Sequence, residues 1–279
     1  MTDDLRTRGR LFLVSTPIGN MGDFSFRAVD VLRSVAVVLA EDTRHSRPLL
    51  DRYDIHTPLA SYHEHNEART TPKFVERMTA GEDVALISDA GTPLLSDPGH
   101  RLVSAAIDAG IEVIPVPGAS ALLAALVASG LSADRFTFFG FLARKGKERA
   151  ATLDEIASSP HTAVLYEAPG RVADSLRELA VRAGGRSAVV ARELTKKFEE
   201  LQRGTLESLS AYYTSTPPRG EVVIVVAGAP PATTDEGTLR DEARGLRARG
   251  LSVRDVAAEL AKRGAPRNLA YRLAQETAE

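Results

Sequence analysis

The sequence predicts an α/β protein with two α/β domains, the first on a mainly parallel sheet and the second on a mixed sheet, followed by a small C-terminal helical region. Short apolar runs such as 84–87 alternate through the first half with segments whose apolar residues recur at helical spacing. This alternation is typical of a parallel sheet with helices on both faces. At 279 residues, the chain is also long for one compact domain.

The N-terminal domain is expected to span residues 1–117. Its first helix contains Phe26, Val29 and Leu32 at helical spacing, with Ser25 or Asp23 as the N-cap. Apolar runs predict strands at 11–14, 35–40, near 59, 84–87 and 111–116. Further helices are expected at 46–53, 71–80 and 100–109.

The second α/β domain is expected to span residues 118–230, because the turn 115–118 precedes a change in the character of the chain. Its predicted strands lie at 136–141, 162–166, 187–192, 200–204 and 221–227, the fourth as part of a hairpin. Its predicted helices lie at 120–128, from 144 onward, and at 171–182. A linker at 229–234 leads into a helical tail domain, 231–279, which Gly250 and Gly264 divide into roughly three helices.

The composition excludes several classes of protein. The absence of cysteine excludes disulfides, thiol catalysis and thiolate metal sites. No run approaches the ~18 apolar residues of a membrane span, and the N-terminus is polar. A formal net charge of -2 argues against binding of nucleic acid through the overall field and leaves local patches open. We therefore expect a cytoplasmic protein with no membrane association.

Glycine-rich nucleotide motifs are absent from the chain. No two glycines are two residues apart, so G-x-G-x-x-G does not occur, and neither does the phosphate-binding loop of nucleoside triphosphatases. This excludes the usual dinucleotide fingerprint and the glycine-rich loop of the commonest methyltransferase fold. A nucleotide-like cofactor would need other loops to hold it.

Four loops that follow predicted strands could hold such a cofactor, and they span residues 15–20, 89–99, 117–121 and 166–170. The carboxyl ends of parallel strands meet at one edge of a sheet, so the first three loops are expected to lie together. They contain no cationic residue, which disfavours a polyphosphate. Backbone groups, small side chains and the carboxylate of Asp89 suit an uncharged or cationic ligand with a ribose and a base.

The segment 62–67 (YHEHNE) raises the question of a metal site. His63 and His65 are two residues apart and would point the same way on an extended segment, with carboxylates nearby. The helical spacing of zinc proteases is missing, however, and no further ligands complete a set. The pattern favours a polar loop that faces the substrate, with no metal. A metal-dependent hydrolase centred on His63, Glu64 and His65 is the alternative from another enzyme class.

Basic residues gather locally despite the negative net charge. Arg144, Lys145 and Lys147 follow a phenylalanine-rich strand, and Lys196 and Lys197 precede Phe198. The segment from Arg244 to the end of the chain contains eight basic residues and four acidic ones. Such patches suit directed contacts to phosphates, and they also occur as ordinary solvated helix surfaces.

Seven segments occur together in the order typical of one family. They are STPIGN at 15–20, AEDTR at 40–44, SYHEHNE at 61–67, SDAGTPLLSDPG at 88–99, GFL at 140–142, YEAP at 166–169 and ARELTK at 191–196. With NLAY at 268–271, they extend over nearly the whole chain. The sequence thus resembles the 16S ribosomal RNA cytidine 2′-O-methyltransferases of the tetrapyrrole methylase superfamily. One departure is Gly170, where that family commonly has histidine, and a side-chain role there is in doubt.

The resemblance implies methylation of a ribose 2′-oxygen of a cytidine in the decoding region of 16S rRNA, within the small ribosomal subunit. It also implies S-adenosylmethionine as cofactor, a cofactor cleft between the two α/β domains, and a homodimer. A sulfonium donor agrees with the lack of cationic loop residues. Within the superfamily, methylation of a small tetrapyrrole or of a protein side chain is the alternative.

The resemblance also implies which residues form the sites. The expected cofactor-binding residues are Pro17, Ile18, Gly19, Asp89, Ala90, Gly91, Thr92, Ser120, Ala121, Tyr166, Glu167 and Leu194. A hydroxyl is a poor nucleophile until its proton leaves, so a base is expected to assist. Candidates for this role or for substrate orientation are Glu41, Asp42, His63, Glu64, Glu193 and Lys196. Substrate contacts are expected at Arg44, Arg144, Lys145, Lys147 and Lys197.

Overall fold

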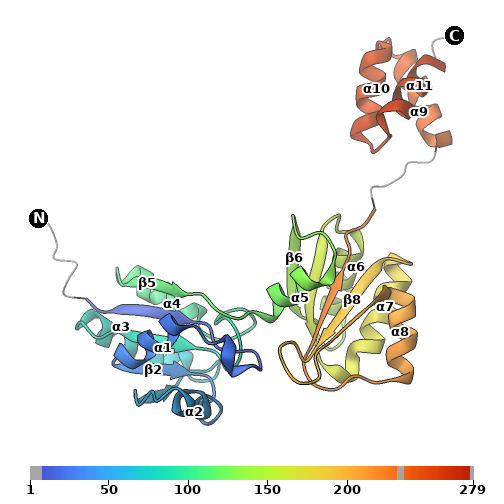
Figure 1. Cartoon of the computed structure of the whole chain (residues 1–279). Coiled ribbons are helices and arrows are strands. Elements are labelled where there is room, and N and C mark those ends of the chain that lie inside the picture. Colours follow the sequence, from blue (N-terminus) through green and yellow to red (C-terminus); the bar gives the residue numbers. More distant parts are fainter. Residues whose placement is uncertain (1–7, 231–235, 277–279) are drawn as a thin grey trace, which may run out of the picture.

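The structure, a computed structural model, describes residues 8–230 and 236–276. Figure 1 shows one sheet in each half of the chain and a group of helices toward the C-terminus. The first sheet has five parallel strands in the order β3-β2-β4-β1-β5. They are β1 Arg10–Val14, β2 Val37–Ala40, β3 Leu59–Ser61, β4 Val84–Ile87 and β5 Glu112–Val116.

Helices cover both faces of this sheet, as the alternation of strands and helices predicts. The side chains of β1 alternate between the faces: Phe12 and Val14 pack in a core with α1 and α2, whereas Leu11 packs in a second core with α3 and α4. All strand residues of β2 and β4 are buried, as in a sheet covered on both sides. The helices are α1 Phe26–Ser34, α2 Thr43–Arg52, α3 Glu67–Thr79 and α4 His100–Asp108, with the 3-10 turn η1 at Met21–Asp23.

The second sheet is mixed and follows the order β6-β7-β10-β8-β9. Strands β6 and β7 are parallel, and the other neighbours are antiparallel. One face packs against α6, α7 and α8, and the other face packs against α5. The strands are β6 Phe136–Phe141, β7 Thr162–Glu167, β8 Ser187–Arg192, β9 Glu200–Thr205 and β10 Val222–Val226. The helices are α5 Ala121–Ser129, α6 Lys147–Ser158, α7 Val172–Ala183 and α8 Leu206–Ser215, with the turn η2 at Pro169–Arg171.

Three helices, α9 Glu236–Ala248, α10 Val253–Lys262 and α11 Arg267–Glu276, form the C-terminal group. Their apolar side chains build a core of their own, which includes Leu246, Leu260 and Leu273. Gly250 and Gly264 lie in the two connections with positive φ, which confirms the predicted division into three helices. Most of the predicted linker, and the start of the tail domain at 231, fall outside the described residues.

Several boundaries differ from the sequence-based prediction. The predicted helices at 46–53 and 71–80 would have Pro48 and Pro72 in their first turns, where proline is well tolerated. In the structure both prolines lie farther inside the helices, and α2 and α3 begin three or more residues earlier than predicted. The basic segment at 144 is a loop, and its helix begins at Lys147. Helix α8 was not predicted, although Thr205 and Ser208 form a capping box at its start. Among the helices in the described ranges, none has the length and apolar character needed to cross a membrane.

Candidate active site

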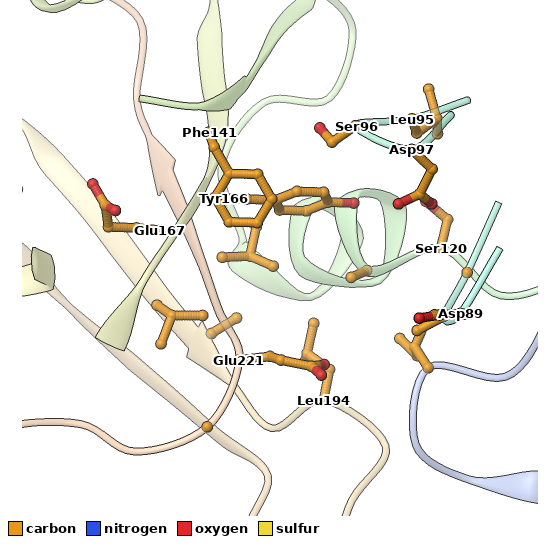
Figure 2. A pocket seen from close by; sticks show the side chains of 18 of the residues that line it. Asp89, Leu95, Ser96, Asp97, Ser120, Phe141, Tyr166, Glu167, Leu194 and Glu221 are labelled. Atoms are coloured by element: carbon orange, nitrogen blue, oxygen red, sulfur yellow. The ribbon is translucent and has the colours of Figure 1, made fainter. Parts of the chain in front are cut away.

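A cavity of about 340 Å³ lies where the loops after β1 and β4 approach the second sheet and the start of α5 (Figure 2). It contains most of the positions expected to bind a cofactor: Ile18, residues 89–92, Ser120, Ala121, Tyr166, Glu167 and Leu194. Pro17 and Gly19 flank Ile18 without lining the cavity. Leu95, Ser96, Asp97, Ala168 and Pro169 also line it and belong to two of the loops predicted to hold a cofactor. Sequence reasoning did not identify the other lining residues, which are Phe141, Ala191 and residues 220–223.

Hydrogen bonds hold the three N-terminal loops together at one edge of the parallel sheet, as expected. The backbones of Thr16 and Gly91 pair, with N···O distances of 2.8 and 3.1 Å. The Thr92 hydroxyl donates to the carbonyl of Ala119 at 3.2 Å and lies 3.1 Å from the hydroxyl of Ser15. These bonds link residues more than 25 positions apart and make the cavity wall a fixed surface.

Strained backbone is concentrated in two segments beside the cavity. Among the described residues other than glycine, five have positive φ. Leu94 and Ser96 belong to the loop after β4, and Glu193 and Thr195 belong to the loop after β8; the fifth is Asp54. Left-handed conformations of such residues are unfavourable and gather at functional sites. The strain therefore agrees with a ligand site at this position.

Three carboxyl groups act on one another beside the cavity: Asp89 and Asp97 from the loop after β4, which line it, and Glu41 at the end of β2, which does not. Burial, followed by the charges of Glu41 and Asp89, raises the pKa of Asp97 to about 6, and a hydrogen bond with the Ser88 side chain opposes this rise. Burial also raises the pKa of Glu41, and Asp89 adds to this effect. Asp89 accepts the backbone N–H of Asp42 at 3.1 Å. The cluster is negatively charged and faces a space with apolar walls.

Aromatic rings form one wall of the cavity. Tyr166 on β7 packs edge-on against Phe138, with ring centroids 4.9 Å apart, and against Phe141 at 5.4 Å. The Tyr166 hydroxyl points toward Asp97 in Figure 2, and burial raises its pKa. Ile18, Leu194 and Val223 add aliphatic surface. This wall suits the flat face of a base.

Glu167 lines the cavity, but its carboxylate forms hydrogen bonds with neighbouring protein groups. The side chain is fully buried, and it accepts hydrogen bonds from the Arg171 guanidinium at 2.6 Å, the Ser175 hydroxyl at 2.5 Å and the Ala168 N–H at 2.8 Å. Arg149 lies 3.9 Å away from the same carboxylate. Glu167 therefore holds the turn at the end of β7 in place.

Glu193 and Lys196 form a separate network beside the cavity. The Lys196 ammonium lies 3.0 Å from Glu193 and 3.1 Å from Glu221. Burial lowers the pKa of Lys196, but the hydrogen bonds and charges of Glu193 and Glu221 outweigh this and raise it overall. Its stem passes over Gly19, where an added Cβ would lie 2.4 Å from the Lys196 Cγ. A charged lysine cannot accept a proton, so its position suits a structural or phosphate contact.

The remaining candidates lie around the end of β2. Asp42 caps α2 and accepts two hydrogen bonds from the Arg44 guanidinium, at 3.1 and 2.8 Å. These bonds hold the pKa of Asp42 well below its usual range. His63 and Glu64 act electrostatically on Glu41. Arg144, Lys145, Lys147 and Lys197 are exposed and do not line the cavity.

The metal-dependent hydrolase alternative is not supported. The rings of His63 and His65 lie 6.0 Å apart. Within residues 8–230 and 236–276, no group of three or more potential ligands is placed to hold a metal ion. The two histidines thus lack the further ligands that a catalytic metal requires.

Comparison with known proteins identifies the family. Residues 10–210 match the tetrapyrrole (corrin/porphyrin) methylases. The chain is 48% identical over 273 residues to ribosomal RNA small subunit methyltransferase I of Synechocystis sp., covering 96% of this chain and 98% of the relative. It is 52% identical over 223 residues to the protein of that name from Pseudomonas aeruginosa, covering 79% of each.

Solved structures share the fold. A diphthine synthase superposes with a TM-score of 0.62 at 15% identity, covering 78% of this chain and 90% of that one. Uroporphyrin-III C-methyltransferase of Thermus thermophilus, complexed with S-adenosylhomocysteine, superposes with a TM-score of 0.56 at 21% identity, covering 78% and 97%. The two α/β sheets and the similarity over almost the full length agree: the chain belongs to the ribosomal RNA small subunit methyltransferase I family of the tetrapyrrole methylases.

Proposed function

We propose that this protein is an S-adenosylmethionine-dependent methyltransferase that methylates the ribose 2′-oxygen of a cytidine in the decoding region of 16S rRNA. Its substrate is the rRNA of the small ribosomal subunit, and it works in the cytoplasm. Relatives named ribosomal RNA small subunit methyltransferase I, which cover 96% and 79% of this chain, support the reaction class and the RNA substrate.

The charge of the cavity carries the cofactor proposal. Among the residues that the structure describes, no lysine, arginine or histidine lines it, whereas Asp89 and Asp97 do. Glu167 and Glu221 also line it, but they pair with Arg171 and Lys196. A cavity with carboxylates and an aromatic wall fits a ligand that combines a positive centre with a planar base. The residues that would hold the cofactor are Ile18, Asp89, Ala90, Gly91, Thr92, Ser120, Ala121, Tyr166 and Leu194, with Pro17 and Gly19 supporting Ile18 and Glu167 supporting the turn after β7.

The bound cofactor supplies an electrophilic methyl group on a positively charged sulfur. The protein then has to align a ribose oxygen with that group, keep water away and accept the hydroxyl proton. The hydrogen-bonded loops after β1, β4 and β5 provide a fixed surface for alignment, which by itself accelerates a transfer reaction strongly. Glu41 has a raised pKa and interacts electrostatically with His63 and Glu64, and these three residues are the proposed groups for orienting the substrate.

Exposed basic residues are the proposed contacts to RNA. Arg144, Lys145 and Lys147 lie in the segment between β6 and α6, and Lys197 lies over the ring of Phe198 at 5.6 Å. Arg44, which pairs with Asp42, is exposed at the start of α2. RNA within a folded particle is recognised by shape and by phosphate contacts spread over a wide surface. The dispersed arrangement of these cations suits that mode better than the binding of a small molecule.

The active form is proposed to be a homodimer. Leu123 and Val127 on α5 are 50% and 74% exposed, and Phe136 at the start of β6 is 38% exposed. These apolar side chains belong to neighbouring segments of the second half of the chain. Apolar surface of this kind is typical of interfaces between subunits.

Transfer of a tritiated methyl group to purified small subunits, free cytidine and tetrapyrroles tests the function. We expect labelling of assembled small subunits and far less of the small molecules, because contacts over a wide RNA surface position the reacting ribose. S-adenosylhomocysteine should raise the melting temperature of the protein, and zinc or manganese should not. Equal labelling of free cytidine would contradict the RNA substrate, and stabilisation by metal alone would contradict the methyltransferase assignment.

A further inference from the structure

A second cavity, of about 210 Å³, lies against the second sheet. Arg192 at the end of β8, Glu200 at the start of β9, and Tyr212 and Tyr213 on α8 contribute to its walls. Among the described residues, none lines both this cavity and the candidate active site. Sites that enclose a drug-sized ligand measure ~300–1,000 Å³, so the second cavity suits a smaller group, such as one unit of a longer molecule.

Tyr213 contributes a buried hydroxyl to this cavity. The residue is 2% exposed, and its ring packs in the core beneath α8. Within residues 8–230 and 236–276, the hydroxyl oxygen has no hydrogen-bond partner. Burial, followed by the charge of Glu200, raises the pKa of Tyr213 to about 12, and Arg192 opposes this rise. The hydroxyl therefore lies near two other lining residues, stays protonated and can donate a hydrogen bond to a ligand.

Flat apolar rings form much of the remaining wall. Tyr212 is 37% exposed and packs edge-on against Tyr213, with ring centroids 4.9 Å apart. Pro217 and Pro218 follow the end of α8 and line the same cavity. Unpaired bases of RNA stack on aromatic side chains, and every base has a flat face for this contact. The rings thus favour a ligand that contains a base.

The cavity also has an excess of positive charge. Arg192 and Glu200 form an ion pair at 2.5 Å, so their charges offset each other. Arg219 lines the cavity, is exposed and forms no ion pair with another described residue. Lys197, proposed above as an RNA contact, lies in the segment that joins β8 to β9. Cations beside a stacking surface are typical of sites that bind a base together with its phosphate.

The second cavity and the candidate active site lie at the same end of the second sheet. Ala191 lines the active-site cavity, and Arg192, the next residue of β8, lines the second one. Successive residues of a strand point to opposite faces, so the cavities lie on the faces covered by α5 and α8. Arg219 likewise precedes Gly220 and Glu221, which line the active-site cavity. A polynucleotide can extend from one cavity to the other, whereas a free nucleotide cannot.

We propose that this cavity binds an unpaired nucleotide of the RNA substrate, with its base on Tyr212 and a phosphate at Arg219. The inference rests on the proposed methyltransferase function. The Tyr213 hydroxyl donates a hydrogen bond to an acceptor atom of the base or of its ribose. The cavity holds the RNA and takes no part in methyl transfer. Its loss should therefore raise the KM for small subunits and leave kcat unchanged.

Three variants of the full chain test the cavity with assembled small subunits as substrate. Tyr212→Ala should raise KM about 10–100-fold, because stacking of a base on an aromatic ring contributes affinity of this order. Tyr213→Phe removes only the hydroxyl and should raise KM about 2–10-fold. Arg219→Gln should raise KM and reduce the slope of log affinity against log salt by about one, because one phosphate contact is lost.

Stability, cofactor binding and a matched control separate a binding role from a structural one. Tyr213→Phe should melt at or above the wild-type temperature, because it removes a buried polar group without a partner. All three variants should bind S-adenosylhomocysteine with wild-type affinity, since none of the replaced residues lines the active-site cavity. Thr214→Ala is the control: Thr214 follows Tyr213 on α8, is exposed and does not line the second cavity. It should retain the wild-type KM.

A fluorescence measurement distinguishes RNA from a free nucleotide as the ligand. The chain contains no tryptophan, so Tyr212→Trp introduces a single indole that still offers a stacking surface. The probe is adenosine 5′-monophosphate, which has a base and a phosphate but cannot reach the active site at the same time. We expect no saturable quenching at micromolar concentrations of this probe, because one nucleotide lacks the contacts that the rest of the RNA makes.

Three results would overturn the inference. They are a wild-type KM in both Tyr212→Ala and Tyr213→Phe, a lowered melting temperature of Tyr213→Phe, which would make the hydroxyl structural, and saturable quenching of Tyr212→Trp by adenosine 5′-monophosphate together with a wild-type KM in Tyr212→Ala. If the wild type does not methylate small subunits at all, the proposed function fails and this inference fails with it. Wild-type methylation with unimpaired variants removes the inference alone.

Discussion

At the scale of single residues, the site depends on backbone conformations that most side chains avoid. Gly91 has a φ of 87° in the turn after β4, where its N–H and carbonyl pair with Thr16. A Cβ added there would lie 3.3 Å from Cγ2 of Ile18, a residue of the cavity wall. Glycine adopts this conformation without steric penalty and permits the close approach. The loop after β4 can therefore pass beside the loop after β1.

Gly91→Ala tests this role. We expect a loss of stability of about 1–2 kcal/mol, because alanine in a conformation with positive φ is strained. Displacement of Ile18 should also weaken binding of S-adenosylhomocysteine, measured by calorimetry beside denaturant unfolding. Gly245→Ala in helix α9 is the control, since no atom lies within 4 Å of the added Cβ. Equal effects of the two substitutions would contradict a special role for Gly91.

At the scale of elements, α5 has apolar residues around its whole circumference. Leu122, Ala125 and Leu126 pack on the second sheet, whereas Leu123 and Val127 remain exposed. A helix that is apolar all round normally lies within a core. The exposed side of α5 therefore supports an interface with a second copy of the chain, as proposed above.

Val127→Glu should convert the homodimer into a monomer. Val127 is 74% exposed, so the substitution adds a charge to the proposed interface without disturbing the packing beneath α5. Light scattering coupled to size-exclusion chromatography measures the mass of the particle. Val181→Glu on α7, where valine is 82% exposed, provides the matched control and should remain dimeric. A monomeric wild type would exclude the proposed dimer.

At the scale of the whole molecule, the two sheets and the C-terminal helices have separate hydrophobic cores. The two sheets supply the loops that surround the cavity, and the helices α9, α10 and α11 have a core of their own. Several arginines of these helices form ion pairs within the group, for example Arg240 with Glu236 and Glu276. Arg254 and Arg267 are exposed, and no ion pair joins either to another residue in the described part of the chain. These two cations are available for phosphate contacts.

Charge reversal by Arg254→Glu together with Arg267→Glu should weaken binding to small subunits and reduce its dependence on salt, because fewer counterions are released from RNA. Affinity for S-adenosylhomocysteine should stay unchanged, since neither residue lines the cavity. Deletion of residues 231–279 should act in the same direction more strongly. Loss of cofactor affinity in the deletion variant would instead indicate a structural role for the tail.

Local sequence was sufficient to predict most of the fold. Apolar runs such as 84–87 and helical spacing depend on neighbours in the chain, and they correspond to β4 and to most of the observed helices. Helix α8 was not predicted from the sequence. Its apolar residues Leu206, Leu209 and Tyr213 have helical spacing, but they begin directly after strand β9, with no loop between the two elements. The boundaries of the domains at 117 and 230 stay predictions.

The sequence by itself determined the α/β class, the loops that follow the strands and the lack of positive charge in those loops. Only the tertiary structure decided which carboxyl groups lie close enough to affect one another's pKa at the cavity. The pKa of a group depends on its burial and on charges nearby in space, and Asp97 receives these from Glu41 and Asp89, which follow two different strands. Neither influence can be read from the residues that adjoin Asp97 in the chain.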